Sequence, residues 1–360
     1  MLCLMNRKIF LFLLISTLAA SCSSLVVDSP EDENQREVFE TLWQEFDNVY
    51  PYFDHKNVEW RSVYNVFDAQ FDENGRVPRP LANILWEMLS QLEDGHVRLI
   101  TPSRIFDHVV NEPGTPRNFS FPVVERLFTV SSILPTNEPL PFFFRIKKIQ
   151  TSQNGPAVFE PIAYMHLGGF PSDQKERWTL AFDAVFESSE AFEGIIIDIR
   201  DNIGGNDAVA LYLAGKFASE KVAFGNVQFR NGPENDDLTA PTPRYVAPTS
   251  EVPFAKPTII LTNRWTLSAA ESFALAMRAA ANATIIGDKT GGSSGGPVVK
   301  ELPNGWLYSI STWIETDLQG QFIEDVGVRP DITVSTEDVL DSGQDLIVST
   351  ALRTLRDQLR

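Results

Sequence analysis

The sequence is poor in cysteine and in positive charge. Only 2 of its 360 residues are cysteines, and 48 acidic residues against 30 basic ones give a net charge of −18 at pH 7. Such an acidic chain is a poor partner for nucleic acid or anionic lipid, because both bind to basic surfaces. The glycines of residues 291–296 lack the lysine–threonine pair of a phosphate-binding loop, and neither a metal-ligand cluster nor a nicotinamide fingerprint is present. We therefore expect a protein without a metal, a cofactor or a nucleic-acid partner.

The apolar run near the N-terminus is too short to cross a membrane. Arg7 and Lys8 precede the apolar stretch 9–15, whereas a spanning helix needs about 20 residues. A basic pair before a short apolar segment is typical of a signal peptide that is removed from the mature protein. We therefore expect residues 1–21 to be a targeting signal that takes no part in the fold.

The end of this signal resembles the lipobox of bacterial lipoproteins. Residues 18–22 read Leu-Ala-Ala-Ser-Cys, with Ala19 in the position that leucine usually takes. The resemblance implies cleavage before Cys22 and its acylation, so that an acidic tether at 22–34 joins a lipid anchor in the bacterial cell envelope to a domain facing the periplasm or the exterior. A plain secretory signal is the alternative. Loss of Cys3 with the signal leaves no pair for a disulfide, so the fold must depend on its apolar core.

Residues 35–92 are predicted to form a small helical domain. Aromatic and aliphatic residues recur there at the three- and four-residue spacing of amphipathic helices. They are Phe39, Leu42, Trp43, Phe46, Val63, Val66, Phe67, Leu81, Ile84, Leu85, Met88 and Leu89.

Residues 93–360 carry the pattern of an α/β domain. The segment 194–200 is almost continuously apolar, as expected for a strand covered on both faces, and a helical pattern precedes it at 178–186. Residues from about 101 to 160 are expected to form a strand-rich insertion in this domain. Its candidate strands are 119–124, 127–133 and 142–146.

An adjacent pair of glycines follows the predicted strand at 194–200. Gly204 and Gly205 close the turn at 201–205, and a helical pattern begins at Asp207. Because these residues lack side chains, their N–H groups can point at a ligand oxygen, and the turn can form half of an oxyanion hole. The alternative is a tight strand-to-helix connection that binds nothing.

A serine stands at the start of the next predicted helix. Ser268 follows the apolar strand 257–261 by a few residues and directly precedes a helical pattern that begins at Ala269. The unpaired N–H groups and the helix dipole favour the oxyanion that forms when a hydroxyl attacks a carbonyl. Ser268 is therefore a candidate acyl-transfer nucleophile. The alternative is a simple N-cap, with Glu271 completing a capping box.

His96 is the histidine best placed to act as a base. It directly follows Gly95 at the predicted start of a strand, where an imidazole can be held close to another chain segment. A solvent-facing turn histidine is the alternative. The other histidines are weaker candidates, because His55 falls in the helical domain, His108 in a loop and His166 inside a strand.

Five segments together resemble the tail-specific, or C-terminal processing, serine peptidase family. The similarity lies with the branch of the tricorn core and the retinoid-binding-protein repeats, and it extends over most of residues 40–355. The resemblance implies a spiral α/β core like that of crotonase or ClpP. It also implies Ser268 as nucleophile, and an oxyanion hole formed by the N–H groups of Ala269 and of Gly204 or Gly205. The matching segments are 50–60, 92–96, 197–205, 262–271 and 327–331.

The chain departs from the better-known branch of that family in its base. Those relatives use a serine/lysine pair, but here Ser293 stands at the lysine position, and Lys289 lies on the other side of Thr290. The tricorn-like branch uses a histidine, which His96 matches. A histidine with an ordinary pKa near 6.5 is largely neutral at pH 7 and can accept the hydroxyl proton. The resemblance thus implies His96 as the general base.

The same resemblance implies a glutamate in the catalytic group. Glu324 lies just before the matching segment 327–331, and Asp325 is the alternative. Tricorn-like enzymes also carry a serine directly before the histidine, where this chain has Gly95.

The function predicted from these residues is hydrolysis of polypeptides through an acyl-enzyme. One alternative is a catalytically inactive protein on the same scaffold that binds a peptide or another ligand. A second is a crotonase-type acyl-CoA enzyme, which does not account for the segments around Ser268 and His96.

Overall fold

The computed structural model covers the predicted globular part of the chain. The predicted signal peptide of residues 1–21, Cys22 and nearly all of the predicted tether lie outside the described residues, as does most of the candidate strand 127–133. Among the described residues, no helix is long and apolar enough to cross a membrane. The described residues are 34–108, 110, 115, 118–128, 140–152, 157–334 and 344–360.

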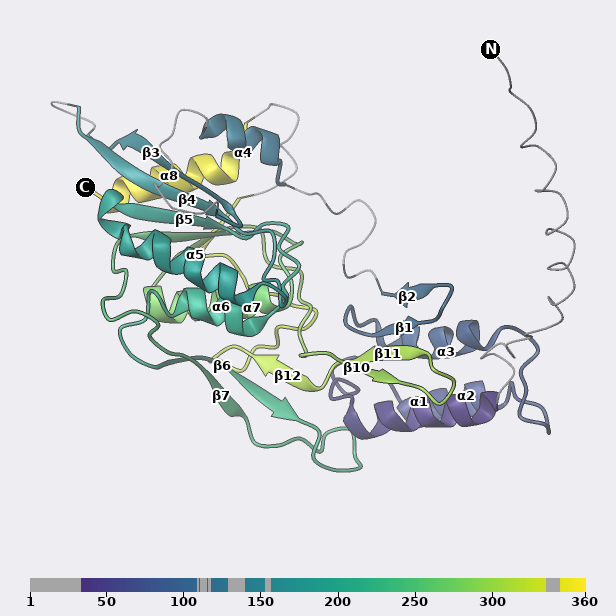
Figure 1. Cartoon of the computed structure of the whole chain (residues 1–360). Coiled ribbons are helices and arrows are strands. Elements are labelled where there is room, and N and C mark those ends of the chain that lie inside the picture. Colours follow the sequence, from purple (N-terminus) through teal and green to yellow (C-terminus); the bar gives the residue numbers. More distant parts are fainter. Residues whose placement is uncertain are drawn as a thin grey trace, which may run out of the picture.

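A six-stranded sheet forms the centre of the larger lobe (Figure 1). Its strand order is β13-β9-β8-β5-β4-β3, and each strand is parallel to its neighbours except the edge strand β3. Strands β5 and β8 are buried along their whole length, as their continuous apolar runs predict. The strands are β3 Phe143–Gln150, β4 Phe159–His166, β5 Gly194–Asp198, β8 Thr258–Thr262, β9 Thr284–Gly287 and β13 Ile332–Thr333.

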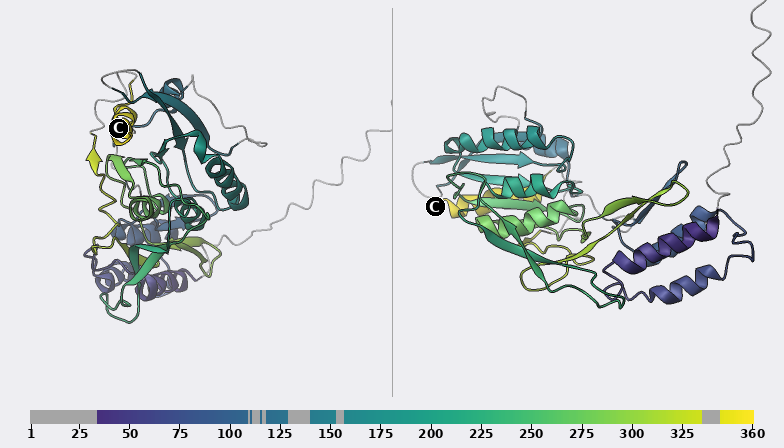
Figure 2. Two further views of the ribbon diagram at one scale, coloured as in Figure 1. Left: turned by 90° about the vertical axis from the view of Figure 1, so that its left-hand side faces the viewer. Right: turned by 60° about the horizontal axis from the view of Figure 1, so that its bottom comes forward.

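Helices cover both faces of this sheet (Figures 1 and 2). Because side chains alternate along a strand, Ile196 and Ile259 pack on one face against α8, whereas Ile195 and Ile260 pack on the other against α5, α6 and α7. The predicted α/β class is confirmed. The helices are α4 Phe121–Leu127 and α8 Leu346–Gln358 on the first face, and α5 Lys175–Glu187, α6 Asp207–Ala214 and α7 Ala269–Ala281 on the second.

The N-terminal helices pack against a second, smaller sheet. The predicted helices within 35–92 are confirmed. Their apolar core is shared with this sheet, because Phe39 and Leu42 belong to the same buried cluster as Trp306 and Tyr308. The strand order is β10-β11-β1-β2. The helices are α1 Gln35–Val49, α2 Trp60–Asp68, α3 Leu81–Leu89 and the 3₁₀ helix η1 Ser90–Leu92, and the strands are β1 Arg98–Ile100, β2 Ile105–Asp107, β10 Val298–Glu301 and β11 Leu307–Ile310.

A three-stranded antiparallel sheet connects the two lobes (Figure 1). Phe224 on β6 belongs to the core of the larger lobe, and Ile314 on β12 belongs to the core around the N-terminal helices. The position of one lobe relative to the other is therefore set by packed side chains. The strands are β6 Val222–Phe229, β7 Thr242–Val246 and β12 Trp313–Thr316.

In the described part of the region 101–160, one predicted strand is a helix, and another belongs to the central sheet and not to a separate insertion. The prediction of a strand at 119–124 is wrong, because Phe121–Leu127 is helix α4. Pro122 occupies the first helical turn, where its missing N–H costs no hydrogen bond, and Val124 is buried against α8. The predicted strand at 142–146 is confirmed as β3, but it pairs with β4 and extends the central sheet.

Candidate active site

Ser268 is positioned by the unit of strand β8, a turn and helix α7. It directly precedes Ala269, the first residue of α7, and its φ of 57° is in the left-handed region that residues other than glycine rarely adopt. Its N–H donates to the Ser293 carbonyl and to the Glu271 carboxylate, each at 2.9 Å. These hydrogen bonds hold the strained residue at the N-terminus of the helix.

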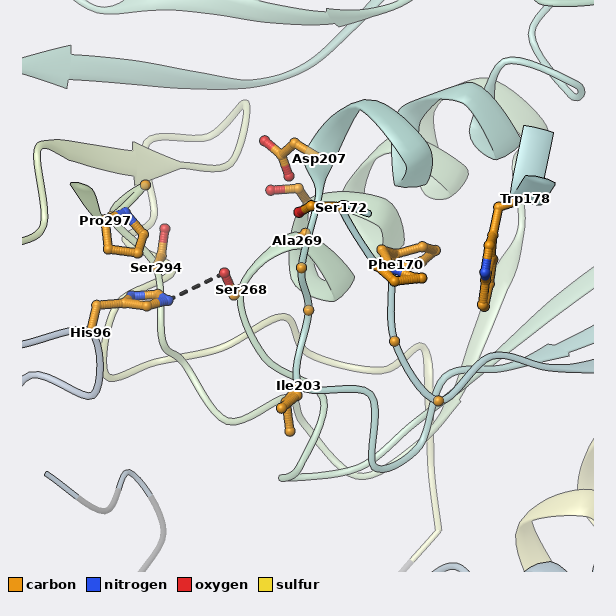
Figure 3. Close-up of a pocket in the computed structure, with 18 of the residues that line it drawn as sticks. His96, Phe170, Ser172, Trp178, Ile203, Asp207, Ser268, Ala269, Ser294 and Pro297 are labelled. Carbon is orange, nitrogen blue, oxygen red and sulfur yellow. Dashed lines mark hydrogen bonds between the residues drawn. The ribbon is translucent and has the colours of Figure 1, made fainter. Parts of the chain in front are cut away.

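His96 lies beside the hydroxyl of Ser268 (Figure 3). Its Nε2 is 3.2 Å from the Ser268 Oγ, although the two residues are 172 positions apart. His96 belongs to the turn before β1, in the smaller lobe, and its own N–H donates to the Asp94 carboxylate at 2.7 Å. The two residues predicted from separate segments therefore meet where the two lobes join.

The imidazole of His96 is in the protonation state that a general base needs. Burial lowers the pKa of His96 below its ordinary value of 6.5, and the charge of Asp94 opposes this shift. His96 is therefore neutral at pH 7. Its other nitrogen, Nδ1, is 3.4 Å from the hydroxyl of Ser293.

The glycine turn after β5 lies directly against Ser268. A Cβ added to Gly204 would come within 2.7 Å of the Ser268 Cβ, so a larger residue would displace the serine. The Gly204 N–H donates to the Asn202 side chain at 2.9 Å. In the described part of the chain, the N–H groups of Gly205 and Ala269 donate to no protein acceptor, and both residues line the pocket at Ser268. Two N–H groups are thus available to an oxyanion.

A pocket of about 1310 Å³ surrounds the serine and the histidine. His96 and Ser268 lie at one end of it, and Phe170 and Trp178 lie toward the other (Figure 3). The pocket thus joins a polar end, where chemistry is possible, to an apolar end that suits an apolar side chain. Further apolar lining comes from Phe119, Phe121, Leu140, Phe142, Phe143 and Ile203.

Glu271 gathers donors from the segments around the serine. Its side chain is fully buried, and its carboxylate accepts hydrogen bonds from the N–H groups of Ser268, Gly292 and Ser293 at 2.9 to 3.0 Å and from the Thr290 hydroxyl at 2.6 Å. Burial raises the pKa of Glu271 to about 7. The Ser268 N–H therefore donates to Glu271, as the alternative of a simple N-cap predicts. The hydroxyl of Ser268 in addition contacts the imidazole of His96.

Glu324 is buried beside the same loop. Its carboxylate accepts from the Ser294 N–H at 2.7 Å and from the Lys56 amine at 2.9 Å. Burial and the nearby charge of Asp94 raise the pKa of Glu324 well above its ordinary value, while Lys56 lowers it. Within the described residues, no hydrogen bond joins Glu324 to His96, so Glu324 meets the loop behind the imidazole and not the imidazole itself.

Lys56 is a site residue that sequence reasoning missed. Its side chain is 5% exposed, and its amine donates to Glu324, to Asp325 at 2.6 Å and to the Glu93 carbonyl at 3.1 Å. No local pattern marks it, because a lysine in a turn of a helical segment looks like any solvated lysine. Asp325, the predicted alternative to Glu324, is 47% exposed and pairs with Lys56 and with His55.

Lys289 makes its side-chain hydrogen bond with a backbone carbonyl of another segment. Its amine donates to the Val326 carbonyl at 3.3 Å. This placement agrees with its sequence position on the far side of Thr290 from the lysine of the serine/lysine relatives.

Comparison with known proteins finds similarity to a peptidase family over part of the chain. Residues 161–334 match the model of peptidase family S41. The carboxy-terminal processing protease CtpA of Bacillus subtilis (strain 168) is 26% identical over 179 residues, which are 49% of this chain and 36% of that protein. The chain thus spans about a third of the length of this curated relative.

Solved structures resemble nearly the whole chain. A candidate peptidase from Parabacteroides merdae ATCC 43184 is 29% identical, with a TM-score of 0.72, over 90% of this chain and 97% of the other. The tricorn protease matches 91% of this chain and 37% of its own length, with 15% identity and a TM-score of 0.52, which is a likeness of fold alone.

Proposed function

We propose that this chain, whose residues 161–334 match the model of peptidase family S41, is a serine peptidase that cleaves polypeptides through an acyl-enzyme on Ser268. The observation that carries the proposal is the 3.2 Å contact between the Ser268 Oγ and the His96 Nε2. Two free N–H groups and an open pocket lie beside this contact. A hydroxyl, a neutral base and an oxyanion site are the parts that acyl transfer requires.

The reaction begins with attack of the Ser268 Oγ on the carbonyl carbon of the scissile peptide bond, while its proton moves to the His96 Nε2. The carbonyl oxygen becomes an oxyanion, which accepts hydrogen bonds from Gly205 and Ala269. The C–N bond then breaks, and the imidazolium gives its proton to the leaving amine. Water next attacks the acyl ester, with His96 again taking and returning the proton, and releases the new carboxyl terminus.

The base in this mechanism is histidine, as in the tricorn-like branch of the family. Two observations support His96 over Lys289. The imidazole lies within reach of the hydroxyl, and its lowered pKa keeps it unprotonated at pH 7. The amine of Lys289 instead donates to a backbone carbonyl. Glu324 acts in this scheme on the loop of Ser293 and Ser294.

Active-site labelling tests the function. Native protein should react with a fluorophosphonate probe and Ser268→Ala should not, and peptide cleavage mapped by mass spectrometry should depend on the same residue. Equal labelling of both proteins, or neither labelling nor cleavage by the native protein, would refute a serine peptidase. The second result would favour a binding protein on this scaffold.

A pair of variants tests the identity of the base. His96→Ala should slow labelling by about 10²-fold or more, because general-base catalysis contributes at least that factor. Lys289→Ala serves as the control and should label at close to the native rate. The opposite order would assign the base to lysine.

We also propose that the mature protein is lipid-anchored in the bacterial cell envelope. The lipobox-like residues 18–22 support this proposal. Palmitate labelling of the expressed full-length chain should depend on Cys22, and equal labelling of Cys22→Ala would contradict the anchor.

A further inference from the structure

The imidazole of His96 has a contact on the side that faces away from the nucleophile. A general-base histidine must carry its proton on Nδ1, so that Nε2 offers a lone pair to the serine hydroxyl. Among the described residues, no hydrogen bond joins the His96 ring to Asp94, whose carboxylate oxygens accept from the His96 backbone N–H and from the Ser311 hydroxyl. The backbone of Ser294 also faces the ring and raises the pKa of His96 through a hydrogen bond. The side-chain oxygen at Nδ1 is the Ser293 Oγ, at 3.4 Å.

Gly95 makes room for this contact. A Cβ added to Gly95 would lie 3.1 Å from the Ser293 Oγ and only 2.1 Å from the Val110 Cγ2. The hydroxyl of Ser293 therefore sits next to the space that a side chain at position 95 would enter. The residue before the histidine supplies no hydroxyl, and the loop after β9 supplies one beside that space.

The backbone of Ser293 is tied to the nucleophile. Its N–H donates to the same Glu271 oxygen that accepts the Ser268 N–H, and its carbonyl accepts a second hydrogen bond from that N–H. Ser293 is 3% exposed. A backbone held this way keeps the Ser293 Cβ, from which the hydroxyl projects, in a fixed position relative to Ser268.

We infer that Ser293 is a positioning residue whose hydroxyl accepts the Nδ1–H of His96 and so fixes the tautomer and ring orientation that the base requires. This inference rests on the proposed function. Ser293 stands where the serine/lysine relatives carry their catalytic lysine, so in this chain the position serves the histidine. Among the described residues, its hydroxyl makes no hydrogen bond to the Ser268 Oγ, and it acts through His96.

Two measurements on Ser293→Ala test the inference. The first is the rate of fluorophosphonate labelling against pH. The rate should fall by about tenfold, the size that loss of one ordinary hydrogen bond produces. The acid limb of the profile should also move to lower pH, because the imidazolium loses one acceptor while Asp94, Arg98 and the backbone hydrogen bond with Ser294 stay in place.

The second measurement does not depend on activity. In protein labelled with ¹⁵N-histidine, the native His96 should show one protonated nitrogen, Nδ1, and one unprotonated nitrogen, Nε2, at pH 8. In Ser293→Ala the two shifts should move toward each other as the second tautomer becomes populated. Ser294→Ala is the matched control, because it removes a hydroxyl from the next residue of the loop, whose partner is Glu315 at 3.0 Å. It should keep the native ring shifts.

The outcomes separate this inference from the proposed function. Native ring shifts and a native pH profile in Ser293→Ala would overturn the role of Ser293, even if Ser268 labels normally. Altered ring shifts in Ser293→Ala, with Ser268 unreactive in the native protein, would uphold the contact and refute the peptidase. A slower rate with unchanged ring shifts and an unchanged acid limb would indicate a merely structural role and would also overturn the inference.

Discussion

Replacement of Lys56 by methionine should destabilise the protein through a buried charge. The Lys56 amine and the Glu324 carboxylate are 2.9 Å apart, with side chains 5% and 2% exposed, so solvent does not screen the pair. Removal of one partner from a buried ion pair costs about 3–5 kcal/mol. The lower end applies here, because Glu324 keeps the Ser294 N–H and can take up a proton. We expect a loss of about 3 kcal/mol in the free energy of unfolding at pH 8.

The pH dependence of this loss follows from Glu324. Burial and Asp94 hold the pKa of Glu324 above its unfolded value of 4.5, and removal of Lys56 takes away the charge that opposes this shift. Between the unfolded and the folded pKa, the folded Lys56→Met variant binds more protons than its unfolded chain. Its stability therefore rises as pH falls toward 4.5 and is lost as pH rises through the folded pKa. The destabilisation should be largest at pH 8 and smaller at pH 5.5.

Urea unfolding followed by tryptophan fluorescence measures these differences. Adding Glu324→Gln to Lys56→Met removes the unpaired charge and should recover more than half of the lost stability. Lys289→Met, which removes an amine bonded to one backbone carbonyl, is the control and should change stability by about 0.5 kcal/mol or less. A loss below about 1 kcal/mol in Lys56→Met, or no recovery in the double variant, would refute the buried-pair reasoning.

Three further predictions concern the chemistry. The labelling rate should fall on the acid side with a midpoint below pH 6.5, because burial lowers the pKa of His96, and a midpoint above pH 7 would contradict this assignment. Gly205→Ala places a Cβ 2.1 Å from the Phe170 carbonyl oxygen. This clash should displace the Gly205 N–H from the oxyanion and slow labelling by about 10²-fold. A native labelling rate would exclude the Gly205 N–H as an oxyanion donor. Trp178→Ala should reduce kcat/KM more for peptides with a large apolar residue in the pocket than for peptides with alanine at that position, as measured by competition between the two peptides. Equal reductions would show that the apolar end of the pocket does not determine specificity.

Local sequence patterns predicted the elements that carry the proposed nucleophile and the proposed oxyanion site. Strands β5 and β8 are continuous apolar runs because the sheet is covered on both faces, and each is followed by a polar turn and a helix. These patterns depend on neighbours in the sequence, so the sequence displays them directly. Helix α4 was missed because Phe121, Val123 and Val124 also suit a strand, and its burial against α8 depends on residues far along the chain.

Long-range contacts were harder to predict. Ser268 and His96 were each placed at the end of an element by local patterns, but their meeting was expected only from the resemblance to a family. Lys56 contacts Glu324 across 268 positions, and no short motif records such a pair. The role of Ser293 was equally hidden, since its sequence position showed only that a lysine was absent.

The candidate active site depends on a loop that has no regular structure of its own. Residues 290–294 cannot satisfy their N–H groups through a helix or a sheet, and unpaired buried N–H groups are costly. Glu271 accepts from Gly292 and Ser293, and Glu324 accepts from Ser294. One carboxylate oxygen can accept several donors, so buried acids fix such a loop where neutral acceptors would leave donors unpaired. Their elevated pKa values follow from that burial, and protonation of these carboxylates would remove acceptors from the loop that holds both Ser268 and the Ser293 hydroxyl.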